Sequence, residues 1–202
     1  RGVRGARVCY VSQSAAASFN PAHRLMDQVI EATLRHGLAT ADEARARAVR
    51  LFGLLGLPEP ETFGNRFPHQ VSGGQLQRAM TAMALCPEPE LIVFDEPTTA
   101  LDVTTQIGTA ALYITHDLAV VAQVADDIMV LRHGETVEHA DTRKIIENPD
   151  EDYTRDLVNV RAVRHTEAAE QSDRFFEMAG INAAYGPTPV LHDVSLHVPR
   201  GQ

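Results

Sequence analysis

The sequence predicts an α/β fold: a mostly parallel sheet, a helical block inserted after the first strand, and a β-hairpin near the carboxyl end. Three observations support this prediction. Three short, apolar, β-rich runs end on polar side chains, which is typical of buried strands in a parallel sheet. The stretch between the first two runs carries apolar residues at helical spacing. Residues 175–202 alternate apolar and polar residues on either side of a Gly-Pro turn.

The composition is that of a globular protein. With 202 residues, 44% of them hydrophobic, the chain can bury one sizeable core, or one core and a smaller module. Its formal net charge of -9 argues against a broad nucleic-acid-binding face. Cys9 and Cys86 lie in apolar runs without metal-ligand spacing, so we expect two buried thiols in a reducing compartment. No uninterrupted apolar run approaches the roughly 18 residues of a membrane span.

The first strand and the helical block are predicted as follows. The run at residues 7–13 ends on Gln13, and a polar loop follows it. Helices are expected near 25–37 and 40–56, the second opened by a capping box of Thr40 and Glu43. With the helix described next, these place a helical block at about residues 20–85.

The stretch "VSGGQLQRA", residues 71–79, opens another helix. Ser72 and Gln75 form a second capping box. Capping does not explain Gly73 and Gly74, because glycine in a helix costs up to about 1 kcal/mol relative to alanine. Bare backbone N–H groups at a helix N-terminus, beside a hydroxyl, can bind an anion such as phosphate. The glycine pair therefore predicts close approach of an anionic ligand.

Beyond the helical block, the spacing of apolar residues along the chain changes from a helical one to one that also includes strands. In chain order we expect a strand at 91–94 buried on both faces, a strand ending at His116, a helix at 118–126, a hairpin at 127–139 turning at His133 and Gly134, short helices at 142–149 and 150–160, and a charged linker.

Polar side chains at the ends of the three strands point to one site. They are Gln13, Asp95 with Glu96, and His116. Ligands of open parallel sheets bind at the carboxyl ends of the strands, so these groups are expected to converge, although each alone also fits turn, capping or structural chemistry.

Such a set suits phosphoryl transfer from a magnesium nucleotide to water. Asp95 would hold Mg²⁺ through water. Glu96 would orient and deprotonate the attacking water. His116 would contact the γ-phosphate, and Gln13 would sense the metal or the water.

Three stretches, in this order behind a glutamine loop, resemble motifs of the ATP-binding-cassette (ABC) ATPases: "VSGGQLQRA" the signature, "LIVFDEPTTALD" the Walker B motif with its D-loop, and "YITHDL" the switch histidine. The resemblance implies a P-loop NTPase-like fold, ATP and Mg²⁺ as cofactors, and ATP hydrolysis. The resemblance implies that Gln13 is the Q-loop residue, that Asp95 binds the metal with Gln13, and that Glu96 is the catalytic base. It implies that Asp102 belongs to the D-loop and that His116 is the switch. The signature, which contacts another cassette's ATP, would consist of Ser72, Gly73, Gly74 and Gln75.

Two further stretches, "SFNP" and "ENPDEDYTRDLV", resemble the branch that serves peptide and nickel importers. This implies a subunit on the cytoplasmic face of the membrane that powers import of peptides or similar small solutes. Its implied partners are permease subunits, a second cassette and, indirectly, a solute-binding protein, with no nucleic acid. The alternative is a non-transport ABC ATPase, either ribosome-associated or of the DNA-repair type. The DNA-repair type inserts long coiled coils where this chain has a compact block.

The sequence departs from the family pattern in two places. It has no P-loop, G-x-x-x-x-G-K-[ST], and its single lysine, Lys144, lies in "TRKII". We therefore expect the chain alone to be inactive. The connection before the third strand is too short for the family's helix, which predicts missing material between Ile107 and Gly108.

The carboxyl-terminal hairpin resembles the opening strands of a second cassette, with Tyr185 where an aromatic ring stacks on adenine. The expected organisation is a piece of a tandem two-cassette protein: a first cassette at 1–159 lacking its P-loop, a linker at 160–174, and the opening hairpin of a second cassette at 175–202.

Overall fold

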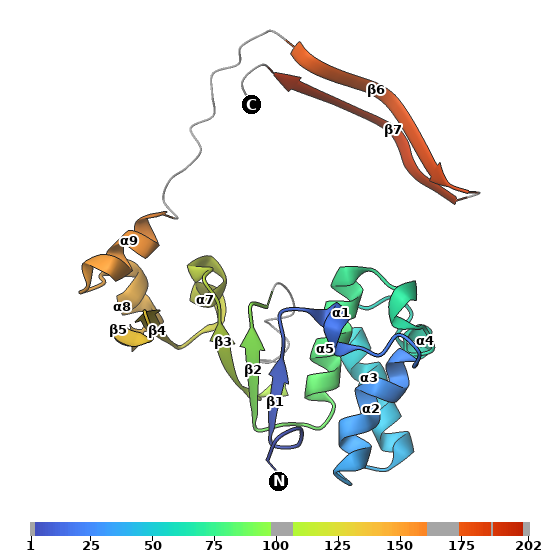
Figure 1. The fold of residues 1–202 in the computed structure, drawn as a ribbon, viewed down its shortest axis with the longest axis horizontal. Coiled ribbons are helices and arrows are strands. Elements are labelled where there is room, and N and C mark those ends of the chain that lie inside the picture. Colours follow the sequence, from blue (N-terminus) through green and yellow to red (C-terminus); the bar gives the residue numbers. More distant parts are fainter. Residues whose placement is uncertain (1–2, 98–106, 161–173, 187, 200–202) are drawn as a thin grey trace. The chain divides into compact units, whose positions relative to one another are not determined.

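The computed structural model describes residues 3–97, 107–160, 174–186 and 188–199 (Figure 1). The chain divides into two compact units, Arg1–Arg161 and Ala162–Gln202. In the described residues no helix is long and apolar enough to cross a membrane.

The first unit is built on a three-stranded parallel sheet. Its order is β1 (Val8–Val11), β2 (Leu91–Asp95), β3 (Ala110–Ile114). Tyr10 pairs with Val93, and Val93 pairs with Leu112. The three strands therefore end at one edge of the sheet (Figure 1). The predicted parallel arrangement of the three apolar runs is confirmed.

The predicted helical block is also confirmed. It contains α1 (Ala15–Ser18), α2 (Leu25–Arg35), α3 (Ala41–Leu54), α4 (Pro60–Phe63), a 3₁₀ turn at Pro68–Gln70 and α5 (Gly73–Leu85). The capping box of α3 is formed, because the Thr40 N–H donates to the Glu43 carboxylate at 2.8 Å and Thr40 Oγ1 accepts from the Glu43 N–H at 3.4 Å.

The loop predicted directly after Gln13 contains a short helix instead, α1. Three consecutive alanines favour it. The Ser18 hydroxyl closes the turn by donating to the carbonyl of Ser14 at 3.0 Å.

One hydrophobic core joins the helices to one face of the sheet. Val11 and Phe94 of the strands belong to the same buried cluster as Met80 of α5. The prediction that residues 91–94 are buried on both faces is wrong. On the other face Leu91 and Val93 are only half-buried, and in the neighbouring strands Tyr10 is 58% exposed and Leu112 is 52% exposed. The reason is that the described helices of the block cover one face only.

The rest of the first unit comprises α7 (Leu118–Val124), β4 (Asp127–Arg132), β5 (Glu135–Asp141), α8 (Thr142–Glu147) and α9 (Asp152–Val160). The predicted hairpin turn is confirmed, with His133 and Gly134 at φ 51° and 82°. Two left-handed residues in succession fit the twist of a tight hairpin.

The second unit is a single antiparallel hairpin, β6 (Arg174–Tyr185) and β7 (Thr188–Pro199), as predicted. The pairing shifts register at several points. Its apolar side chains are largely exposed, for example Phe176 at 48% and Leu196 at 49%. The predicted linker lies mostly outside the described residues.

Candidate functional site

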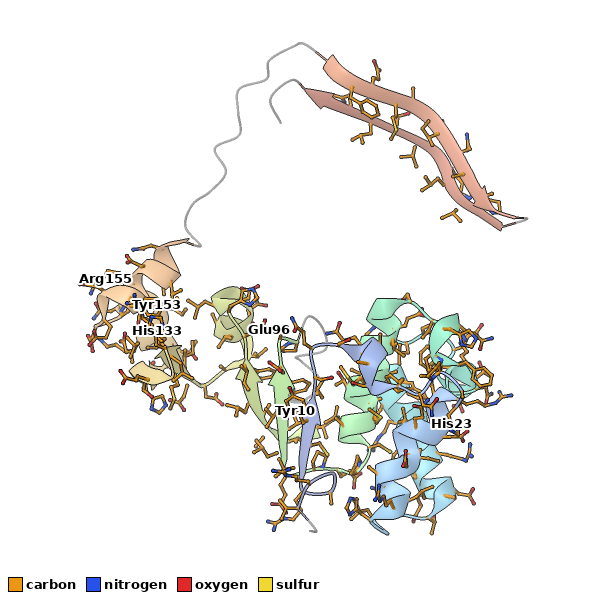
Figure 2. The ribbon with its side chains drawn as sticks, in the orientation of Figure 1. Tyr10, His23, Glu96, His133, Tyr153 and Arg155 are labelled. Atoms are coloured by element: carbon orange, nitrogen blue, oxygen red, sulfur yellow. The ribbon has the colours of Figure 1, made fainter. Side chains whose placement is uncertain are left out.

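The structure brings the predicted strand-end residues to one edge of the sheet. Asp95 is the last residue of β2, Gln13 follows β1 by two residues, and His116 follows β3 by two residues. Neighbouring strands lie about 4.8 Å apart, so these side chains start from adjacent positions. Figure 2 shows Glu96 at this edge.

Glu96 is held at both oxygens of its carboxylate. Oε1 lies 2.8 Å from His116 Nδ1, and Oε2 accepts from the Thr115 hydroxyl at 3.2 Å. Its N–H donates to the Ile114 carbonyl at 2.8 Å, and its backbone is left-handed, with φ 50°. A non-glycine residue in that region is uncommon and is held there by its surroundings.

This pairing shifts both titrations. The hydrogen bond to His116 lowers the pKa of Glu96, and the bond to Glu96 raises the pKa of His116. In this arrangement Glu96 is an ionised carboxylate and a weak base. It becomes a stronger base when His116, the main cause of the lowered pKa, releases it.

Thr115 is a residue that the sequence reasoning missed. Its hydroxyl donates to Glu96 and accepts the N–H of Asp117 at 3.1 Å. The hydroxyl therefore ties the end of β3 to the end of β2. The available signal was its position directly before His116, at the end of a predicted strand.

Asp95 has a partner that the sequence reasoning also missed. The Tyr10 hydroxyl donates to Asp95 Oδ2 at 2.5 Å, and this bond raises the pKa of Tyr10. Figure 2 shows Tyr10 on β1, the strand next to β2. Strand alternation was the available signal, because Tyr10 pairs with Val93 and Val93 shares a face with Asp95.

The donor set at this edge fits Mg²⁺. Mg²⁺ prefers oxygen ligands and keeps several waters. Asp95 supplies a half-buried carboxylate, and the exposed amide of Gln13 supplies a carbonyl oxygen.

The helix N-terminus predicted to bind an anion has the expected local structure. The Ser72 N–H donates to Gln75 Oε1 at 3.1 Å, and Ser72 Oγ accepts from the Gln75 N–H at 3.3 Å. A Cβ on Gly73 or Gly74 would meet nothing within 4 Å. The described chain therefore does not itself require glycine at either position.

This helix N-terminus does not join the strand-end cluster. The Ser12 hydroxyl, just beyond β1, lies 3.6 Å from the Met80 sulfur. Ser72 precedes Met80 by eight residues, which is about 12 Å along a helix. Because α5 leads back to the start of β2, Ser72 lies at the end of α5 that is farther along the chain from that start.

Three other residues singled out in the sequence do not add to the site as the structure describes it. Asp102 lies outside the described residues, as does most of the connection suspected of missing material. Tyr185 ends β6, but its side chain is not among those described. Lys144 is paired with Asp150 at 2.5 Å.

Comparison with known proteins gives consistent matches. Residues 2–99 match the family model described as "ABC transporter". A probable peptide ABC transporter ATP-binding protein, y4tR of Sinorhizobium fredii, is 41% identical over 172 residues, 79% of this chain and 51% of the relative. The oligopeptide transport ATP-binding protein OppD of Bacillus subtilis is 40% identical over 78% of this chain and 48% of its own length.

The glutathione import ATP-binding protein GsiA of Escherichia coli K12 is 39% identical over 78% of this chain and 27% of its own length. The chain thus spans about half the length, or less, of these curated relatives.

Solved structures agree on the fold. The dimeric post-hydrolysis state of the ATP-binding cassette MJ0796, bound to ADP and Pi, matches 70% of this chain and 66% of its own with a TM-score of 0.60 and 26% identity. The cbiO1 protein of Clostridium perfringens matches 68% of this chain and 58% of its own with a TM-score of 0.58. At 18% identity the cbiO1 match shows the fold alone. Residues 2–99 of the chain therefore carry a domain that matches the ABC transporter family, and the chain is similar to ATP-binding proteins of ABC transporters in both sequence and fold.

Proposed function

We propose that the chain is part of an ATP-hydrolysing subunit that powers an importer for peptides or similar small solutes. The observation that carries the hydrolytic part is Glu96, bound to His116 and Thr115 beside Asp95 at one sheet edge. The relatives are named as peptide, oligopeptide and glutathione transport proteins, and these names support the solute class.

The strand-end residues have distinct roles in this proposal. Asp95 and Gln13 hold Mg²⁺ through its water shell, with Tyr10 fixing the Asp95 carboxylate. Bound Mg²⁺ neutralises phosphate charge. Glu96 orients the attacking water and takes its proton, a contribution of about 10²–10⁴ in rate. His116 releases Glu96 and turns toward the γ-phosphate.

The helix N-terminus serves a different nucleotide. Ser72, Gly73, Gly74 and Gln75 bind the γ-phosphate held by another cassette, across a head-to-tail pair. Ser72 lies about 12 Å along α5 from Met80, and Met80 contacts Ser12 next to Gln13. This separation from the strand-end residues supports the division. Asp102 acts in the D-loop between the two cassettes.

The domain organisation and the partners belong to the same proposal. Residues 1–159 form a cassette from the Q-loop onward, 160–174 a linker, and 175–202 the opening hairpin of a second cassette in which Tyr185 stacks on adenine. The protein lies at the cytoplasmic face of the membrane and is bound to permease subunits. A solute-binding protein delivers the solute to these subunits.

The test is solute uptake by the intact gene product with its membrane partners in vesicles. We expect labelled di- or oligopeptide uptake to need hydrolysable ATP and to fail with a non-hydrolysable analogue. An Asp95→Asn variant should need more Mg²⁺ for half-maximal uptake. Competition with unlabelled peptide and with Ni²⁺ distinguishes the solute. If peptides and Ni²⁺ change neither uptake nor ATP turnover, the importer assignment is wrong.

A further inference from the structure

The carboxyl end of α3 leaves backbone carbonyls without partners inside the helix. The chain turns there through Gly56, which has φ 62°, and the Leu57 N–H donates back to the Phe52 carbonyl at 2.9 Å. This is the usual glycine-terminated helix end. The carbonyls of Leu55 and Gly56 stay available at the negative end of the helix dipole.

Arg78 of α5 fills this position. Its Nη1 donates to the Gly56 carbonyl at 2.8 Å and to the Leu55 carbonyl at 3.1 Å. Its Nε donates to the carbonyl of Gly74 at 3.3 Å. A single guanidinium therefore joins the end of α3 to the first turn of α5.

The first turn of α5 is a part of the chain that needs such support. Gly73 and Gly74 lack side chains, and positions for a Cβ on them face open space, so these two residues add no side-chain packing between the core contacts of Val71 and Leu76. The capping box acts only between Ser72 and Gln75 and does not tie the turn to another element. Among the described hydrogen bonds, the Arg78 guanidinium supplies that tie, because it bonds Gly74 and also the carbonyls at the end of α3.

The shape of the side chain matters. The planar guanidinium presents several donors in a fixed fork and can bridge two elements. A lysine ammonium at the same place could still cap α3 as a point charge, but it would not hold Gly74 in the same geometry.

We propose that Arg78 is a positioning residue that anchors the anion-binding turn of α5 to the end of α3. It holds the amides at Gly73 to Gln75 in the geometry that another cassette's γ-phosphate requires. This inference rests on the proposed function.

The test compares Arg78→Lys and Arg78→Met with a matched control, Arg45→Met. Arg45 is an exposed arginine of α3 whose ion pair with Asp27 spans 3.8 Å. In the full chain, amide exchange at Gln75 and Leu76 should quicken about tenfold in both Arg78 variants, the factor that one hydrogen bond of ordinary net strength is worth. The Arg45 variant should leave this exchange unchanged.

The second readout is ATP turnover by the intact gene product with its membrane partners. Both Arg78 variants should lose about tenfold or more in kcat while KM for ATP stays within about twofold, because a displaced group costs rate and the other cassette's own ATP contacts remain. The thermal midpoint of Arg78→Lys should lie close to that of wild type, although its kcat stays low. If Arg78 had only a structural role, both the thermal midpoint and kcat of Arg78→Lys would return toward the wild-type values.

Two results overturn the inference. In the first, a Ser72→Ala variant lowers turnover while the Arg78 variants do not, so the site works without its anchor and the proposed function stands. In the second, neither Ser72 nor Arg78 variants change turnover of an active transporter. The proposed role of the α5 turn then fails together with the inference.

Discussion

Replacing Gly73 and Gly74 by alanine should stabilise the fold and impair the function. Neither glycine has positive φ, and an added methyl group on either would meet nothing within 4 Å. An alanine at a compatible site stabilises by about 0.4–1 kcal/mol. The double variant should therefore gain about 1–2 kcal/mol, or roughly 2–8 °C in thermal midpoint for a protein of this size. Thermal unfolding followed by circular dichroism measures this gain.

The functional loss has a separate cause. An anion at the α5 N-terminus must come within about 3 Å of backbone N–H groups. Two methyl groups beside those amides obstruct it, so ATP turnover of the assembled transporter should fall about 10²-fold, as for a displaced oxyanion donor.

The matched control is Gly53→Ala, in α3. Its added Cβ would lie 3.9 Å from Pro60, an ordinary contact, and far along the chain from the predicted anion site. This variant should gain stability without losing turnover. The reasoning is refuted if the double variant is stabilised and hydrolyses ATP as fast as wild type, because nothing then approaches the glycines.

Three other predictions test the fold and the strand-end cluster. Thr115→Val should lower the free energy of unfolding by about 1 kcal/mol and the rate of ATP turnover about tenfold, because Glu96 loses a hydrogen bond that positions its carboxylate. An unchanged rate would show that the hydroxyl has no role in the reaction. Glu43, whose pKa the N-cap hydrogen bonds lower, stabilises the fold above its unfolded pKa of about 4.3, and this contribution disappears as the pH falls through the folded pKa. Denaturant unfolding should thus show wild type and Glu43→Gln converging under acid conditions; a constant gap would contradict the assigned cause. Gly64→Ala should lower the free energy of unfolding by about 1–3 kcal/mol, because the added Cβ would lie 2.8 Å from the Met26 Cβ. An unshifted thermal midpoint would show that Met26 can move away without loss of stability.

Much of the fold follows from local patterns in the sequence. The capping boxes of α3 and α5 were predictable because their residues are three apart in the chain. The strand ends at Gln13, Asp95 and His116 were predictable from composition and period. Convergence of these ends followed from a rule about parallel sheets that needs no side-chain coordinates.

The parts that could not be predicted depend on contacts between distant segments. Tyr10 and Asp95 are far apart in sequence, and only the strand register brings them together. The Arg78 anchor likewise depends on how α3 and α5 pack. The half-buried second face of β2 was missed because a run of apolar residues looks the same whether one face or two are covered.

The most direct measurement is ATP hydrolysis by the intact gene product with its membrane partners, comparing wild type with Glu96→Gln and Glu90→Gln. Glu90 lies just before β2, at the opposite end from Glu96, and pairs with Arg7 at 2.7 Å, so its variant controls for loss of a carboxylate. Wild type and Glu90→Gln should hydrolyse ATP at similar rates, while Glu96→Gln should lose about 10²-fold or more and still bind ATP. Equal rates in all three proteins would contradict the assignment of Glu96 as the catalytic base.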